Sequence, residues 1–174
     1  ATLDSFLAQN YPHSRYEIIV ADNNSTDNTR KIAGQYVGNS RVSVKYFFEE
    51  RQGVHYARNS AAKQASGDIL YFTDDDMVAD PALLDELVKV FALFPEVGCA
   101  TGLILPLFNK EPPAWVRRCM WNAHLSLTEK DKPEELIVSN NDLVFSCHQA
   151  VRRDLFFQSG GFNPENTAGT WIGD

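Results

Sequence analysis

The sequence predicts a single open α/β domain, with a twisted, mainly parallel sheet flanked by helices. Two observations predict it. Segments with strand character alternate with segments of helical periodicity along most of the chain. Hydrophobic residues make up 44% of the 174 residues and charged residues 22%. This length and composition suffice for one domain with a buried core, so we expect residues 1–174 to form that domain.

The expected elements follow one another in a regular order. Residues 2–9 have the pattern of the later part of an amphipathic helix, so we expect the chain to begin inside an element. β-branched and aromatic runs predict the strands, and apolar residues at helical spacing predict the helices between them. Strands are expected over 16–21, 41–48, 68–73 and 97–105, with helices over 27–36, 54–65 and 81–94. After Pro106 the pattern loosens; regular structure is expected again over 136–147, followed by a short helix over 152–159.

Charge and cysteine content exclude several classes of protein. The net charge is −7 and the 16 Lys and Arg residues are scattered, so nucleic acid is not an expected partner and an anionic substrate would need a cation. Cys99, Cys119 and Cys147 form no close pair typical of a zinc site or a disulfide framework, which favours reduced thiols in the cytoplasm. The apolar runs are much shorter than the roughly 20 residues that span a bilayer.

Polar clusters follow two of the predicted strands, at the sheet edge where open α/β folds bind ligands. The first is Asp22-Asn23-Asn24-Ser25, which could face a ligand or could simply cap the next helix. The second is the acidic triplet, Asp74-Asp75-Asp76, directly after the most hydrophobic strand. Adjacent carboxylates repel one another but suit a hard divalent cation such as Mg²⁺ or Mn²⁺. A solvated acidic turn is the alternative interpretation.

Two other acidic motifs were compared with the triplet. Val78 and Ala79 stand where a calcium loop needs an acidic or amide residue and a glycine, so an EF-hand is excluded. A phosphatase of the haloacid dehalogenase type also places Asp-x-Asp after an apolar strand, and Asp74 with Asp76 would supply its nucleophile and its acid/base partner. This phosphatase is the alternative function from another reaction class.

A third cluster, 51–59, leads through a glycine turn into a helix rich in small residues. Arg58 could pair with a nucleotide or with a structural carboxylate. The alanines of this helix allow close packing on the sheet. His55 could face a ligand or could be an ordinary surface histidine.

In order, these segments resemble glycosyltransferase family 2, the nucleotide-sugar transferases with the GT-A fold. The resemblance rests on 17–27 (EIIVADNNSTD), 53–59 (GVHYARN), 65–76 (ASGDILYFTDDD) and 160–163 (GGFN). It implies a Rossmann-like GT-A sheet whose first strand is missing from this chain. It divides the domain into a nucleotide-binding part, 1–105, and an acceptor-side part, 106–174. A dehalogenase-type phosphatase would carry its Asp-x-Asp on the first strand, which argues against that alternative.

The resemblance also implies an activity and a set of residues. The expected enzyme is a metal-dependent, inverting hexosyltransferase that uses a nucleotide sugar, with a UDP-sugar as the expected donor. Asp22 is similar to the family's uracil-facing aspartate, Asp74 would face the ribose, and Mn²⁺ or Mg²⁺ would bind at Asp76 and Asp75. Asp174 is the candidate catalytic base, in the position of the family's Gly-acidic-Asp motif. The implied nucleotide-binding residues are Asp22, Asn24, Arg58, Asp74 and Asp75.

The expected acceptor is a saccharide or a lipid-linked sugar in polysaccharide or glycoconjugate synthesis. Residues 109–132 and 140–148 would set its specificity. Trp115 and Trp121 could stack on a sugar ring, or they could be core residues or membrane-facing anchors. We expect a cytoplasmic protein, with peripheral membrane contact made through segments outside this chain. A degenerate domain that binds nucleotide sugar without catalysis is the second alternative.

Overall fold

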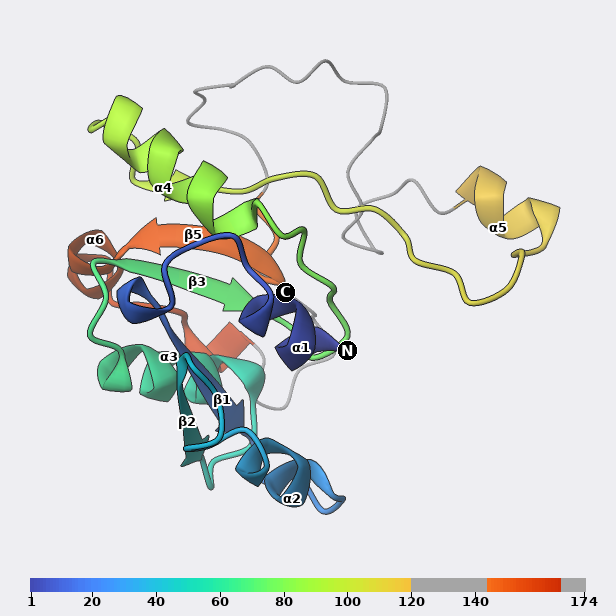
Figure 1. Ribbon diagram of the computed structural model, residues 1–174, viewed down its shortest axis with the longest axis horizontal. Coiled ribbons are helices and arrows are strands. Elements are labelled where there is room, and N and C mark those ends of the chain that lie inside the picture. The colour runs from blue at the N-terminus through green and yellow to red at the C-terminus, as the bar shows by residue number, and fades with distance from the viewer. Residues whose placement is uncertain (120–143, 167–174) are drawn as a thin grey trace.

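The structure, a computed structural model, describes residues 1–119 and 144–166 (Figure 1). The predicted alternation of strands and helices is confirmed through α4, with boundaries that shift by one or two residues. The elements in chain order are α1 (Thr2–Leu7), η1 (His13–Arg15), β1 (Glu17–Asp22), α2 (Thr29–Gly34), β2 (Ser43–Phe48), α3 (Val54–Gln64), β3 (Ile69–Thr73), α4 (Leu83–Leu93), β4 (Cys99–Ala100), α5 (Ala114–Cys119), β5 (His148–Arg152), α6 (Arg153–Gln158) and η3 (Pro164–Asn166).

The described strands pair in two sheets. β1 and β2 are parallel, with Asp22 opposite Phe48 at their ends. In the other sheet, β5 lies between β3 and β4 and is antiparallel to both, so β3 and β4 run parallel to each other. The antiparallel strand β5 was not predicted from the sequence, and β4 is much shorter than the expected strand over 97–105. Of the regular structure expected over 136–147, residues 136–143 lie outside the described residues, and 144–147 precede β5 without forming a strand.

Helices cover both faces of the sheet formed by β3, β5 and β4. Alternate residues of β3 point to opposite faces, as strand geometry requires. On one face, Leu87 and Phe91 of α4 pack against Ala150, which is 0% exposed, with Ile69 and Tyr71 beside them. On the other face a second cluster joins α3, α6, β3 and β5, and its buried members are Ala62, Leu70, Phe72, Val151 and Phe156. The sheet therefore lies in the middle of three layers (Figure 1).

α3 contacts both sheets, because it also packs on β1. Its small residues Ala57 and Ala62 are 6% and 3% exposed, which confirms the predicted close packing. The carboxyl ends of β1 and β3 are therefore brought together through one helix.

The later part of the segment between β4 and α5 leads away from the sheets, and so does α5 (Figure 1). Leu107 in this segment is 78% exposed and Trp115 of α5 is 64% exposed, so Trp115 is not a core residue. Trp121 lies outside the described residues. Among the helices that the structure describes, none is long and apolar enough to cross a bilayer.

Candidate functional site

Asp22 ends β1 and is almost completely buried, at 3% exposed. Its Oδ1 accepts a hydrogen bond from the backbone N–H of Ser25, 2.9 Å away, and its Oδ2 accepts one from the Tyr46 hydroxyl, 2.6 Å away. Burial alone would raise the pKa of Asp22, but these hydrogen bonds outweigh it and lower that pKa. Asp22 is therefore an ionised carboxylate that holds the loop after β1. Sequence reasoning missed Tyr46, whose position on the same face as Val42 and Val44 was the available signal.

The next two residues face different surroundings. Asn23 bonds to the segment before α3: its Nδ2 donates to the carbonyl of Arg51, 2.6 Å away, and its Oδ1 accepts from the N–H of Gly53, 2.8 Å away. Asn24 is exposed, with a φ of 59°, a left-handed conformation that asparagine tolerates well. The capping role expected for this loop belongs to Asp27, whose Oδ1 accepts hydrogen bonds from the backbone N–H and the hydroxyl of Thr29.

Arg58 joins α3 to the acidic triplet. It is 7% exposed, and its Nη2 donates to Oδ1 of Asp74 at 2.9 Å. Arg58 therefore pairs with a carboxylate of the protein. The guanidinium also lies over the ring of Phe162, 5.5 Å from its centroid, so Arg58 links three segments that are far apart in the sequence.

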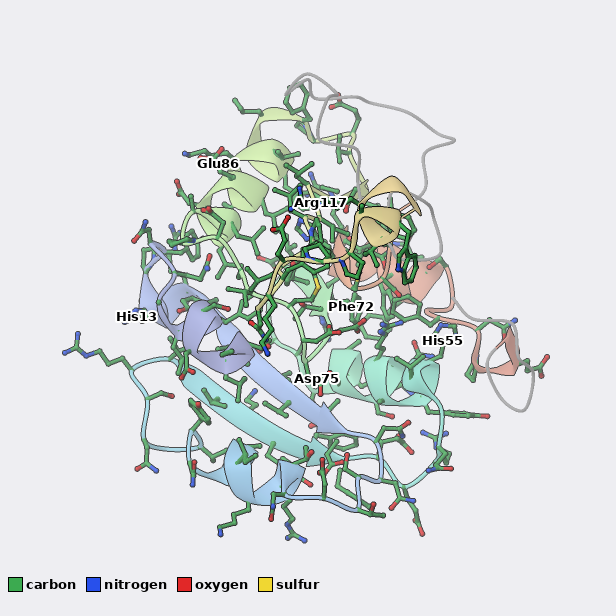
Figure 2. All side chains as sticks on the ribbon, turned by 90° about the vertical axis from the view of Figure 1, so that its right-hand side faces the viewer. His13, His55, Phe72, Asp75, Glu86 and Arg117 are labelled. Atoms are coloured by element: carbon green, nitrogen blue, oxygen red, sulfur yellow. The ribbon has the colours of Figure 1, made fainter. Side chains whose placement is uncertain are left out.

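Among the residues that the structure describes, only part of the acidic triplet, Asp74 to Asp76, pairs with another side chain. One oxygen of Asp74 accepts from Arg58, while Asp75 and Asp76 are exposed. Asp75 lies between α1 and α3 (Figure 2). Within residues 1–119 and 144–166, no three His, Cys, Asp or Glu residues come together in a group that could hold a metal ion. Mg²⁺ at phosphate-handling sites usually takes one or two protein carboxylates and completes its shell with water and substrate phosphates. Two exposed carboxylates fit such a metal.

A buried carboxylate, Glu49, orders the segment between β2 and α3. Its oxygens accept from Nε and Nη2 of Arg51, at 2.8 and 2.9 Å, and from the hydroxyl of Ser60, 2.5 Å away. Hydrogen bonds from Arg51 and then Ser60 lower the pKa of Glu49 to about 2. The Arg51 guanidinium also lies 4.7 Å from the centroid of the Tyr56 ring. This ionic cluster fixes the entrance to α3, and sequence reasoning did not find it.

α3 also holds the Gly-Gly-Phe-Asn segment. The Asn59 side chain donates to the carbonyl of Phe162 at 2.7 Å and accepts from its N–H at 3.0 Å. His55 stacks on the Phe162 ring, with centroids 5.2 Å apart, and its Nδ1 lies 2.8 Å from the carbonyl oxygen of Asn163. Because His55 is 7% exposed, the interpretation as a surface histidine was wrong. Its contacts are with the protein.

His148 begins β5 opposite Thr73, the residue before the acidic triplet. Its Nδ1 and the Tyr71 hydroxyl share a hydrogen bond at 2.7 Å, and burial lowers the pKa of His148 and raises that of Tyr71. A Cβ on Gly102 would lie 2.7 Å from Nε2 of His148, so a larger residue there would displace the buried imidazole. This buried pair of Tyr71 and His148 therefore stabilises the end of β3 beside the acidic triplet. The candidate base Asp174 lies outside the described residues.

Comparisons with known proteins identify the family and the fold. The model of the family described as glycosyl transferase family 2 matches residues 1–103. The glycosyltransferase AglE of Haloferax volcanii is 40% identical over 77 residues, which cover 42% of this chain and 24% of AglE.

Two solved structures share the fold. S. aureus TarS 1–349 in complex with UDP superposes with a TM-score of 0.71 at 21% identity, covering 97% of this chain and 47% of that one. The mannosyltransferase PcManGT from Pyrobaculum calidifontis, in complex with GDP-Man and Mn²⁺, gives 0.68 at 23%, covering 94% and 43%. The chain therefore spans less than half the length of each of these three proteins. Because the family match covers more than half of the chain and the fold is that of GT-A enzymes, the chain belongs to glycosyltransferase family 2.

Proposed function

We propose that this chain is the nucleotide-sugar-binding part of an inverting, metal-dependent glycosyltransferase. The observation that carries the proposal is the meeting of the three sequence clusters at α3. Asn23 holds the segment that enters α3, and Arg58 of α3 holds Asp74. This connection places one buried carboxylate, Asp22, and an exposed acidic triplet at the carboxyl ends of two strands, where open α/β folds bind their ligands.

We assign the residue roles as follows. Asp22 and Asn24 would line the base side of the nucleotide, and Arg58 would position Asp74 toward the ribose. Asp22 still has acceptor capacity beyond its two hydrogen bonds, so it could accept a further hydrogen bond from a base. The proposed nucleotide contacts are Asp22, Asn24, Asp74 and Asp75, and Arg58 would act through Asp74.

Asp76, with Asp75, would hold Mn²⁺ or Mg²⁺. A divalent ion there would offset the charge that builds on the departing nucleoside diphosphate. The protein's net charge of −7 opposes the approach of an anionic donor, and such a cation would offset that repulsion. In the inverting reaction a carboxylate takes the proton of the attacking acceptor hydroxyl, and Asp174 is the proposed base.

The donor and acceptor classes are also proposals. A UDP-sugar is the proposed donor, and the likeness to TarS in complex with UDP supports it, whereas PcManGT in complex with GDP-Man makes a guanosine donor the competitor to test. The proposed acceptor is a saccharide or lipid-linked sugar in polysaccharide or glycoconjugate synthesis. A cytoplasmic location is also proposed, and the scattered cysteines support it.

The test is a calorimetric panel of UDP, GDP, CDP and dTDP, each with and without Mn²⁺. We expect one nucleotide to bind selectively and only with the metal. Asp76→Asn should remove the metal-dependent part of the binding. The matched control is Asp68→Asn, which makes the same charge change at an exposed position before the other end of β3. Equal metal-dependent binding by Asp76→Asn and the native protein would contradict the metal assignment.

The two alternatives give different results. A phosphatase would release phosphate from a phosphomonoester, but the triplet follows the third described strand and the chain belongs to a transferase family, so we do not retain it. A binding-only domain would show the same metal-dependent nucleotide affinity as an enzyme. It would transfer no sugar to any acceptor in a product assay with the matching nucleotide sugar.

A further inference from the structure

Three polar residues near the N-terminus lie on one side of α1. Thr2, Ser5 and Gln9 are spaced by three and four residues, which aligns them along a helix face. Gln9 follows the end of α1 but is only 4% exposed, an unusual position for an uncharged polar side chain. A buried amide must be paired, so its partners show what it holds.

The partners of this side of α1 lie in the segment from 75 to 84, which connects β3 to α4. The Thr2 hydroxyl donates to the carbonyl of Asp75 at 2.5 Å, and the Ser5 hydroxyl accepts from the N–H of Ala79 at 3.0 Å. Gln9 donates to the carbonyl of Asp80 at 2.7 Å and accepts from the N–H of Leu84 at 3.1 Å. Asp76 lies between two of the backbone groups that α1 holds.

α1 itself is anchored to the strand that carries the triplet. Phe6, the buried residue of α1, packs against Tyr71 of β3, with ring centroids 5.8 Å apart. The Tyr16 hydroxyl donates to the carbonyl of Phe6 at 2.9 Å. α1 is therefore fixed to β3 while its polar side holds the backbone beyond that strand.

We propose that Thr2, Ser5 and Gln9 are positioning residues for the metal-binding carboxylates. These residues hold the backbone on both sides of Asp76. They thereby keep the carboxylates of Asp75 and Asp76 close together although the two negative charges repel each other. They touch neither metal nor nucleotide, and they set the metal affinity through the conformation of the segment. This inference rests on the proposed function and adds the element that determines how tightly its metal binds.

Two variants and one rescue test the inference. Thr2→Val removes only the hydroxyl, Thr2→Ser restores it, and Gln9→Met removes the amide at similar length. The matched control is Ser40→Ala, since the Ser40 hydroxyl donates to backbone carbonyls of Tyr36 and Val42, away from this segment. Mn²⁺ is titrated into the protein with the selected nucleotide held constant. Amide hydrogen exchange is measured in parallel.

We expect Thr2→Val to weaken apparent Mn²⁺ affinity about fivefold, the effect of one hydrogen bond, and Gln9→Met to weaken it at least as much. Thr2→Ser and Ser40→Ala should keep native affinity. In Gln9→Met the amide of Leu84 should exchange faster, because its acceptor is gone.

Native Mn²⁺ affinity in Thr2→Val and Gln9→Met, despite faster exchange at Leu84, would overturn the inference. So would an equal loss of affinity in Ser40→Ala, which would indicate a general effect of lost stability. If the native protein binds no nucleotide with Mn²⁺, the proposed function fails first and takes this role with it. In that outcome the native protein shows no binding in the titration, while its Leu84 amide is still protected from hydrogen exchange.

Discussion

A single methyl group added at Gly161 should disrupt the contact between α3 and the residues that follow α6. Its φ is +75°, and a Cβ there would lie 2.6 Å from Oδ1 of Asn59 and 3.2 Å from the Phe156 ring. Its neighbour Gly160 has a φ of +90°, but a Cβ there would meet no atom within 4 Å. Ala at either position carries the cost of a left-handed backbone, about 1–2 kcal/mol. Only Gly161→Ala also displaces the Asn59 amide.

The displaced amide makes two hydrogen bonds to the backbone of Phe162, at 2.7 and 3.0 Å. At about 1 kcal/mol each, their loss makes Gly161→Ala about 2 kcal/mol less stable than Gly160→Ala. For a chain of this size the difference is roughly 4–8 °C in Tm. Urea unfolding of both variants and the native protein measures it.

Equal destabilisation by the two alanine variants would refute this reasoning, because it would show that the close approach to Asn59 has no cost. Asn59→Ala in the native background provides a cross-check. If the two hydrogen bonds from Asn59 to Phe162 are the source of the extra loss, Gly161→Ala should lower stability less in the Asn59→Ala background than in the native protein.

Two further predictions concern charged groups. Because the pKa of Glu49 is held at about 2, below the ordinary 4.5, the unfolded state binds a proton in this window that the folded state does not. The free energy of unfolding should therefore fall as the pH drops from about 4.5 toward 2, by at most about 3 kcal/mol. The loss should be smaller than this, because the exposed Arg51 is screened by solvent. Glu49→Gln should flatten this pH dependence, measured by urea unfolding at pH 7 and pH 3. Arg58→Lys keeps the charge but loses the planar guanidinium that reaches Asp74. Metal-dependent nucleotide affinity, measured by calorimetry, should therefore fall about tenfold. A variant with native affinity would contradict the positioning role of Arg58.

The sequence predicted the elements whose signal is local. β1, β3 and α3 combine a periodic apolar pattern with polar residues at their ends, and the structure has all three. β5 was missed because His148-Gln149-Ala150-Val151-Arg152 has no apolar alternation. It is a strand because β3 and β4 pair with it on both edges, and because α4 covers the small Ala150. Such long-range pairing leaves little trace in a short segment.

The site shows the same division. The carboxylates of Asp22 and the acidic triplet were placed at strand ends by local pattern. The partner of Asp22 depends on the register of β1 and β2, which puts Tyr46 two positions before the residue opposite Asp22. The burial of His55 depends on Phe162, which is more than a hundred residues away in the sequence. Register and long-range packing are properties of the folded chain that single residues do not signal.

Helix packing contributes to the geometry of the candidate site. Asp22 ends β1 and Asp74 follows β3, and within the described residues these two strands belong to different sheets. α3 contacts both: it packs on β1, and its Ala62 lies in the core cluster with Leu70 and Phe72 of β3. A bulkier residue than alanine at this contact would move the two strand ends apart, because close-packed interiors transmit such changes. The small residues of α3 therefore help to set the spacing of the two strand ends.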